Sequence, residues 1–137
     1  MKKLVSVKEL DIRFSEVDSM GIVWHGNYAR YFEDGREAFG REFGLGYMDI
    51  FDAGFYAPLV DLHFQFKKTL QYRQKMRIET VYVPSEAAKI IFSYTLFNEK
   101  NELVTTGSSV QVFLDRNYNL VLFNPDFYQI WKEKNLQ

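Results

Sequence analysis

Apolar and polar residues alternate along much of the second half of the chain, and this alternation predicts strands with one buried face. The alternating segments are residues 60–67, 76–83, 89–97 and 103–114. Short turn sequences such as Pro84-Ser85-Glu86 separate the later segments, so consecutive strands there must run antiparallel. Near the N-terminus, Leu10, Ile12 and Phe14 alternate with polar residues and predict a further half-buried strand over residues 10–14.

Between these strands the apolar spacing changes to that of a helix. The predicted helix begins at Asn27, ends at Gly44 or Gly46, and buries a stripe formed by Tyr28, Phe32, Gly35 and Phe39. Asn27 is predicted to cap the helix, because its side-chain oxygen can accept a free backbone N–H. Gly35 costs the helix about 1 kcal/mol relative to alanine, and a close approach to a packed sheet would explain its presence.

The remaining segments complete an α+β pattern. Residues 44–58 read as a loop with one short turn, and the sequence DFYQIWKEKN after Pro125 predicts a short C-terminal amphipathic helix. One long helix followed by at least four antiparallel strands predicts a single helix packed on a single sheet. Because no linker or internal repeat interrupts the chain, residues 1–137 are predicted to form one domain.

Composition excludes several classes of protein. The chain is 47% apolar and 18% aromatic, which allows a real core and also suits an apolar pocket or subunit interface. A net charge of −1 gives no general attraction to nucleic acid. There is no cysteine, and His25 and His63 do not form a metal motif. We find neither a signal peptide nor a run of about 18 apolar residues, and expect a cytoplasmic protein without membrane insertion.

The stretch DSMGIVWHGNY, residues 18–28, combines the groups needed for acyl transfer. Asp18 is a carboxylate that can act as nucleophile or general base. Gly21 and Gly26 let the backbone approach a ligand closely. The helix start that follows presents backbone N–H groups that can stabilise charge on a carbonyl oxygen. Such a pattern is also compatible with an ordinary structural turn before a helix.

The longer run RFSEVDSMGIVWHGNYARYFE resembles the hotdog-fold acyl-CoA thioesterases of the 4-hydroxybenzoyl-CoA thioesterase type, particularly their YbgC-like branch. The matching positions are Arg13, Glu16, Asp18, Gly21, Val23, His25, Asn27 and Tyr28. The resemblance continues more weakly through the strands. It implies a long central helix wrapped by a curved antiparallel sheet, in agreement with the order of elements predicted above.

The resemblance also implies roles for individual residues. Asp18 would attack the thioester carbonyl or activate water, and the backbone N–H at His25 would polarise the carbonyl. The His25 side chain would contact the carbonyl or the leaving group. The remaining candidates for substrate binding in this stretch are Gly21, Val23, Trp24, Gly26, Asn27 and Tyr28. Asn27 and Tyr28 are interpreted first as a helix cap and a packing residue.

The segment KKTLQYRQK departs from the family pattern, because Thr69 stands near the usual proline and Arg73-Gln74 replace an acidic turn. This departure bears on substrate identity more than on the reaction. Lys67 and Arg73 belong to a positive cluster that could contact the phosphates of coenzyme A, or could be a solvated turn. The aromatic segment 45–56 could cover an acyl chain, pack in the core or contact another subunit.

The sequence therefore predicts an acyl-CoA thioesterase that needs no cofactor apart from the coenzyme A of its substrate, and no metal. The resemblance implies a homodimer or homotetramer, with Phe64 or Tyr94 as possible contact residues. Two alternatives remain: a hotdog hydratase or dehydratase acting on acyl thioesters, and a non-catalytic protein that binds acyl thioesters.

Overall fold

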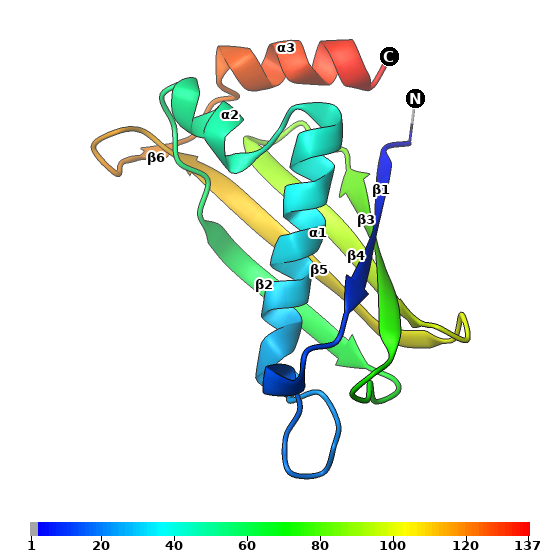
Figure 1. Ribbon diagram of the computed structural model, residues 1–137. Coiled ribbons are helices and arrows are strands. Elements are labelled where there is room, and N and C mark those ends of the chain that lie inside the picture. The colour runs from blue at the N-terminus through cyan, green and yellow to red at the C-terminus, as the bar shows by residue number, and fades with distance from the viewer. Residues whose placement is uncertain (1–2) are drawn as a thin grey trace.

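One long helix crosses one face of an antiparallel sheet in the computed structural model, which describes residues 3–137 (Figure 1). Residues 1 and 2 of the predicted domain lie outside the described residues. The strands are β1 (Val5–Asp11), β2 (Leu59–Phe66), β3 (Lys75–Val83), β4 (Lys89–Asn98), β5 (Leu103–Leu114) and β6 (Leu120–Val121). The helices are α1 (Tyr28–Phe43), α2 (Tyr47–Asp52) and α3 (Asp126–Asn135). The predicted α+β architecture, with its long helix and short C-terminal helix, is confirmed.

The sheet has the strand order β1-β3-β4-β5-β2, and β6 adds a short pairing to β5. All pairs are antiparallel. Strands β1 and β2 are the two edges of the main sheet. The backbone along the outer side of β2 therefore pairs with no other strand in the described residues. Three apolar side chains of β2 are exposed, namely Leu59, Val60 and Phe66. An exposed apolar edge strand invites pairing with another chain.

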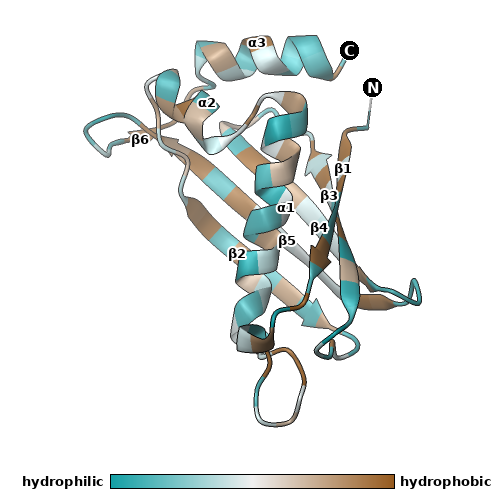
Figure 2. Cartoon of the chain, viewed as in Figure 1, coloured by the Kyte–Doolittle hydropathy of each residue, from teal (hydrophilic) through white to brown (hydrophobic). Residues whose placement is uncertain are grey.

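The core lies between α1 and the sheet, and aromatic rings fill most of it. The buried face of α1 includes Phe32, whose ring stacks on Tyr94 at 4.2 Å and on Phe64 at 4.8 Å between centroids. Figure 2 shows the corresponding bands of hydrophobic and hydrophilic residues along β5 and β2. Close to the C-terminal end of α1, the indole N–H of Trp131 donates to the carbonyl of Phe43 at 2.7 Å. Helix α3 thereby satisfies one of the free carbonyls at the end of α1.

Two glycines set the distance between α1 and the sheet. A Cβ added to Gly35 would lie 2.4 Å from the hydroxyl of Thr80, and one added to Gly107 would lie 2.3 Å from the ring of Phe32. Both distances are far below van der Waals contact. The prediction that Gly35 allows a close approach is confirmed. Gly107 on β5 likewise lets the sheet approach the ring of Phe32 on α1.

The N-terminal strand differs from its prediction. Strand β1 begins at Val5 and ends at Asp11, and Phe14 starts a 3-10 turn, η1 (Phe14–Glu16), with 73% of its surface exposed. The buried carboxylate of Glu16 accepts the backbone N–H of Arg13 at 2.8 Å. This hydrogen bond turns the chain before Phe14 can continue the alternation.

One of the two expected subunit contacts was wrong. Tyr94 is 1% exposed and cannot supply a subunit contact, because its hydroxyl bonds to Ser109 at 2.5 Å and to Arg36 at 3.1 Å inside the fold. Phe64 is half-buried against Phe32, and its place at a subunit contact stays a prediction. None of the helices in residues 3–137 combines the length and apolar character needed to cross a membrane.

Candidate functional site

Residues 16–24 form a small hairpin directly before α1. Val17 and Val23 face each other in an antiparallel bridge, and the backbone N–H of Asp18 donates to the carbonyl of Ile22 at 2.9 Å. At the tip, the N–H of Gly21 donates to the carbonyl of Asp18 at 2.9 Å with φ of +78°. Residues with a side chain rarely adopt this angle. The local sequence therefore fixes the backbone of Asp18 close to the helix start.

The carboxylate of Asp18 is half-buried and held by one hydrogen bond. Its Oδ1 atom accepts the N–H of Met20 at 2.8 Å, which is an Asx-turn. Within residues 3–137, the Oδ2 atom has no hydrogen-bond donor. One oxygen thus orients the group, and the other is available to a water molecule or a carbonyl carbon.

The chain after the hairpin enters α1 through a 3-10 turn, η2 (His25–Asn27). The N–H of Asn27 donates to the carbonyl of Trp24 at 3.0 Å, while those of His25 and Gly26 find no acceptor in the described part of the chain. These two donors lie at the positive end of the helix dipole. They are suited to bind an oxygen that gains negative charge.

Asn27 does not cap the helix as predicted. Its backbone is helical, and no side-chain cap is formed. Its side-chain amide instead donates to the carbonyl of Glu16 at 2.8 Å. Because η2 continues directly into α1, Asn27 already has a helical backbone and does not lie in the extended conformation of a cap residue. Asn27 therefore ties the helix start to the hairpin that carries Asp18.

Glu16 is the positioning residue that the sequence did not single out. Its side chain is 5% exposed, and one oxygen, Oε1, accepts the N–H of Arg13 at 2.8 Å and the hydroxyl of Tyr31 at 3.1 Å. Its carbonyl also accepts the N–H of Trp24 at 2.9 Å. Burial and the nearby Glu16 carboxylate raise the pKa of Tyr31, so this phenol remains a donor. One indication of this role was present in the sequence, since Glu16 is among the positions that match the family pattern.

Trp24, His25 and Gly26 form the exposed surface at the helix start. The Trp24 ring lies over Gly26, where an added Cβ would be 2.2 Å from the ring, and its centroid is 5.1 Å from the His25 ring. Trp24 remains 52% exposed. The two rings are therefore presented to solvent beside the free N–H groups.

We expect Gly26→Ala to displace the Trp24 ring and leave the fold intact. The new methyl group meets only the outer edge of an exposed side chain, so the free energy of unfolding should change by less than about 1 kcal/mol. Because the ring borders the candidate site, the KM for a thioester substrate should rise. Thermal unfolding and steady-state kinetics check the two parts separately, and Gly26→Ala with wild-type kinetics would remove Trp24 from the site.

Val23 and Tyr28 are the most buried of the candidates, at 5% and 3% exposed. The N–H of Val23 donates to the carbonyl of Leu70 at 2.7 Å, and the Tyr28 ring packs on Phe66 at 4.9 Å between centroids. Burial raises the pKa of Tyr28 to about 12. Both side chains pack in the core, and their contact with substrate stays a prediction.

Lys67 and Arg73 lie on the exposed segment between β2 and β3. Arg73 has φ of +75° in a tight turn, and neighbouring Lys68 forms an ion pair with Glu102 at 2.6 Å. Neither Lys67 nor Arg73 has a carboxylate within 4.0 Å in residues 3–137. A bridge between Ile22 and Gln71 attaches this segment to the Asp18 hairpin.

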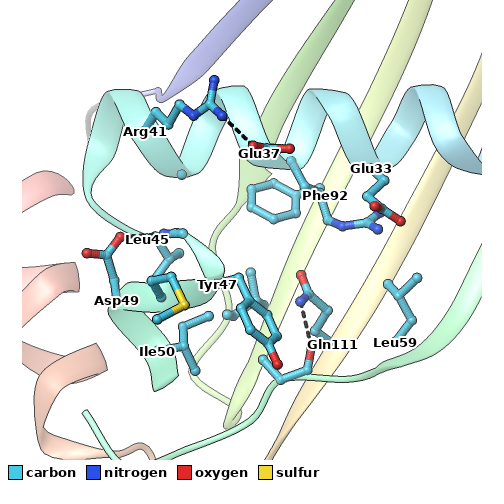
Figure 3. Close-up of a pocket in the computed structure, with 16 residues that line it drawn as sticks. Glu33, Glu37, Arg41, Leu45, Tyr47, Asp49, Ile50, Leu59, Phe92 and Gln111 are labelled. Atoms are coloured by element: carbon cyan, nitrogen blue, oxygen red, sulfur yellow. Dashed lines mark hydrogen bonds and ion pairs between the residues drawn. The ribbon is translucent and has the colours of Figure 1, made fainter. Parts of the chain in front are cut away.

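A cavity of about 650 Å³ opens between α1, α2 and the strands β4, β5 and β2 (Figure 3). Its apolar lining consists of Leu45, Met48, Ile50, Ala57, Leu59, Ile90 and Phe92. The ion pair of Glu37 with Arg41 lies on its α1 side, and the amide of Gln111 donates to the carbonyl of Ala57 at 2.7 Å. The aromatic segment 45–56 thus forms α2 and one wall of a cavity. None of the predicted site residues lines it within one chain.

Comparisons with known proteins agree on one family. The family described as "Thioesterase-like superfamily" matches residues 12–130. A Bacillus subtilis protein named "Putative acyl-CoA thioesterase YneP" is 33% identical over 82% of this chain and 81% of its own length. The acyl-acyl carrier protein thioesterase ATL3 of Arabidopsis thaliana is 27% identical over 82% of this chain and 60% of its own.

A solved structure is similar over nearly the whole chain. The DHNA-CoA thioesterase from Staphylococcus aureus superposes with a TM-score of 0.85 at 29% identity, covering 96% of this chain and 91% of that chain.

Proposed function

Since the chain belongs to the thioesterase-like superfamily and has the hotdog fold, we propose that it hydrolyses an acyl-CoA thioester to a carboxylic acid and free coenzyme A. One observation carries the proposal. Asp18, whose Oδ2 atom has no donor among residues 3–137, lies on a hydrogen-bonded hairpin that leads to two N–H groups at a helix start, which have no acceptor among the same residues. A carboxylate and an oxyanion site are the minimum that acyl transfer to water requires.

In this mechanism the thioester oxygen accepts the N–H groups of His25 and Gly26. Asp18 either takes a proton from water, which attacks the carbonyl carbon, or attacks the carbon itself to give a mixed anhydride that water then opens. The carbon–sulfur bond breaks, and the coenzyme A thiolate takes up a proton. We expect the exposed imidazole of His25 to contact this leaving group. Both routes consume one water and release one acid and one thiol.

A homodimer built through β2 would complete the site. Phe66, at one end of β2, packs beside Tyr28 at the start of α1, while Leu59 at the other end lines the cavity. Antiparallel pairing of two β2 strands places the Phe66 end of one copy beside the Leu59 end of the other. The Asp18 hairpin of one copy then approaches the cavity of the other, which would hold the acyl group. The exposed apolar residues of β2 support this interface.

A subunit-mixing experiment checks this arrangement. We expect Asp18→Asn and a cavity-filling variant, Ala57→Phe, each to be inactive, and their mixture after unfolding and refolding to regain activity. Each mixed dimer has one complete site, because the Asp18 of one chain meets the open cavity of the other. With random pairing, the mixture should reach roughly a quarter of wild-type activity per chain. If the mixture recovers no activity, each site would instead combine the cavity and the Asp18 of the same chain.

Thiol release from a panel of acyl-CoA thioesters tests the proposal as a whole. The panel should include aliphatic chains and hydroxylated aromatic acyl groups, because the similar Staphylococcus aureus enzyme is a DHNA-CoA thioesterase. The corresponding thioesters of acyl-carrier protein should also be assayed, because the Arabidopsis relative is named an acyl-acyl carrier protein thioesterase.

The panel also separates the two alternatives. Hydration of an enoyl thioester without thiol release would favour a hydratase or dehydratase. Saturable binding of a thioester without thiol release would favour a non-catalytic binding protein. The resemblance to the YbgC-like branch of the 4-hydroxybenzoyl-CoA thioesterase type predicts that the preferred substrate is one of the acyl-CoA thioesters of the panel.

A further inference from the structure

Two aromatic rings next to the Asp18 hairpin are exposed and touch each other. Phe14 and Tyr72 are 73% and 43% exposed, and their rings meet edge to face with centroids 5.4 Å apart. Neither ring is needed to fill the core. Exposing two adjoining aromatic rings to water costs free energy, which a planar ligand stacked on the face of one ring and touching the other would recover.

Hydrogen bonds hold the two backbone turns that carry these rings. Phe14 starts η1, which the Glu16 carboxylate closes on the N–H of Arg13. Tyr72 lies in a turn in which the N–H of Gln71 donates to the side chain of Gln74 at 2.8 Å. The N–H of Ile12 donates to the carbonyl of Gln74 at 3.3 Å and joins the two turns. The pair is therefore a preformed surface.

The same turns place this surface beside the reactive carboxylate. Ile22, whose carbonyl accepts the N–H of Asp18, also bridges to Gln71 in the turn that carries Tyr72. A substrate bound between Asp18 and the N–H group of His25 can thus extend one end across this surface.

Basic residues are neighbours of the pair along the chain. Arg13 directly precedes Phe14 in the chain, and Arg73 directly follows Tyr72; both arginines are exposed. Arg13 and Arg73 form no ion pair in the described residues, and Lys67 lies in the same exposed segment as Tyr72. Two carboxylates lie nearby: Asp11 is opposite Lys75 in the register of β1 and β3, and Asp34 on α1 has a pKa that burial raises and the nearby charge of Arg13 partly lowers. An exposed aromatic face bordered by a second ring, beside arginines without an ion-pair partner in the described residues, matches a ligand that joins a planar base to phosphates.

We propose that Phe14 and Tyr72 form the adenine subsite for the coenzyme A end of the substrate, with Arg13 and Arg73 facing its phosphates. This inference rests on the proposed function and identifies the carrier as coenzyme A, because an acyl-carrier protein presents its phosphopantetheine without an adenine. The flexible pantetheine arm follows the surface from the Asp18 hairpin to the two rings.

The test compares one acyl group on two carriers. We expect Phe14→Leu and Tyr72→Leu each to raise the KM for the acyl-CoA about tenfold, the amount expected for loss of one base-stacking contact. With the same acyl group on pantetheine, which has no nucleotide, KM and kcat should stay at wild-type values. Tyr72→Phe is the matched control, since it keeps the ring and should keep the wild-type KM.

A binding measurement makes the test independent of turnover. Calorimetry with adenosine 3′,5′-bisphosphate should show binding to the wild-type protein and about tenfold weaker binding to each leucine variant. An unchanged nucleotide affinity would overturn the subsite, as would an equal effect on both carriers. If sedimentation instead showed that the leucine variants dissociate while nucleotide affinity is unchanged, the pair would be a subunit contact. Absence of thiol release with intact nucleotide binding would contradict the proposed hydrolysis but not the subsite.

Discussion

Asp18→Asn should lower the rate of thiol release from acyl-CoA about a thousandfold while the protein remains folded. Asparagine has the same shape, and its side-chain oxygen can still accept the N–H of Met20 that fixes the turn. It lacks the negative charge needed to attack the carbonyl or to take a proton from water. Loss of a positioned base commonly costs between a hundredfold and ten-thousandfold in rate. Steady-state assays at saturating substrate measure the loss in kcat.

The binding of substrate provides the control for this variant. If Asp18 acts only in the chemical step, Asp18→Asn should bind a non-hydrolysable acyl-CoA thioether with wild-type affinity. Thermal unfolding should likewise be unchanged within a few degrees. Near wild-type turnover by the folded asparagine variant would remove Asp18 from the reaction.

Glu16→Ala should lower both stability and activity. The buried Oε1 atom accepts the hydroxyl of Tyr31 and the N–H of Arg13, and the alanine variant leaves both donors without a partner. Each unsatisfied buried group costs about 1–3 kcal/mol, and because the Arg13 N–H is only partly buried, the free energy of unfolding should fall by about 2–4 kcal/mol. The hairpin that carries Asp18 would loosen, and kcat should fall more than the KM changes. Denaturant titration and steady-state kinetics measure these effects.

Glu16→Gln is the matched variant. Its amide oxygen can accept the same two hydrogen bonds without the charge. Recovery of both stability and kcat in Glu16→Gln would show that Glu16 acts by positioning the hairpin. A glutamine variant as inactive as alanine, but stable, would instead give the charge of Glu16 a part in the reaction.

The elements with long regular patterns could be predicted from the sequence, and those decided by single hydrogen bonds could not. The apolar stripe of α1 and the alternation of β5 extend over several repeats, so tertiary contacts reinforce the local preference. Phe14 also continued an alternation, but Glu16 turned the chain before it. Tyr94 was expected as a possible subunit contact, yet Ser109 and Arg36 satisfy its hydroxyl in the core. Such partners are distant in sequence and leave no local pattern.

The candidate site divides in the same way. Asp18, Gly21 and His25 are close in sequence, and the hairpin and helix start keep them close in space. The cavity draws its walls from α1, α2 and three strands, so no single stretch of sequence could describe it. The aromatic segment 45–56 indicated an apolar role without specifying which surface it would face.

The tight contacts of Gly35 and Gly107 have a consequence for the range of substrates that this scaffold can acquire. Because helix and sheet already touch through bare backbone at these two points, the long helix has no room to sink deeper, and lifting it would open the core. In the proposed acyl cavity, adaptation to larger or smaller groups can therefore come from side chains of the α2 wall, where Met48 is exposed. The close contact between helix and sheet is then kept, while this short segment changes.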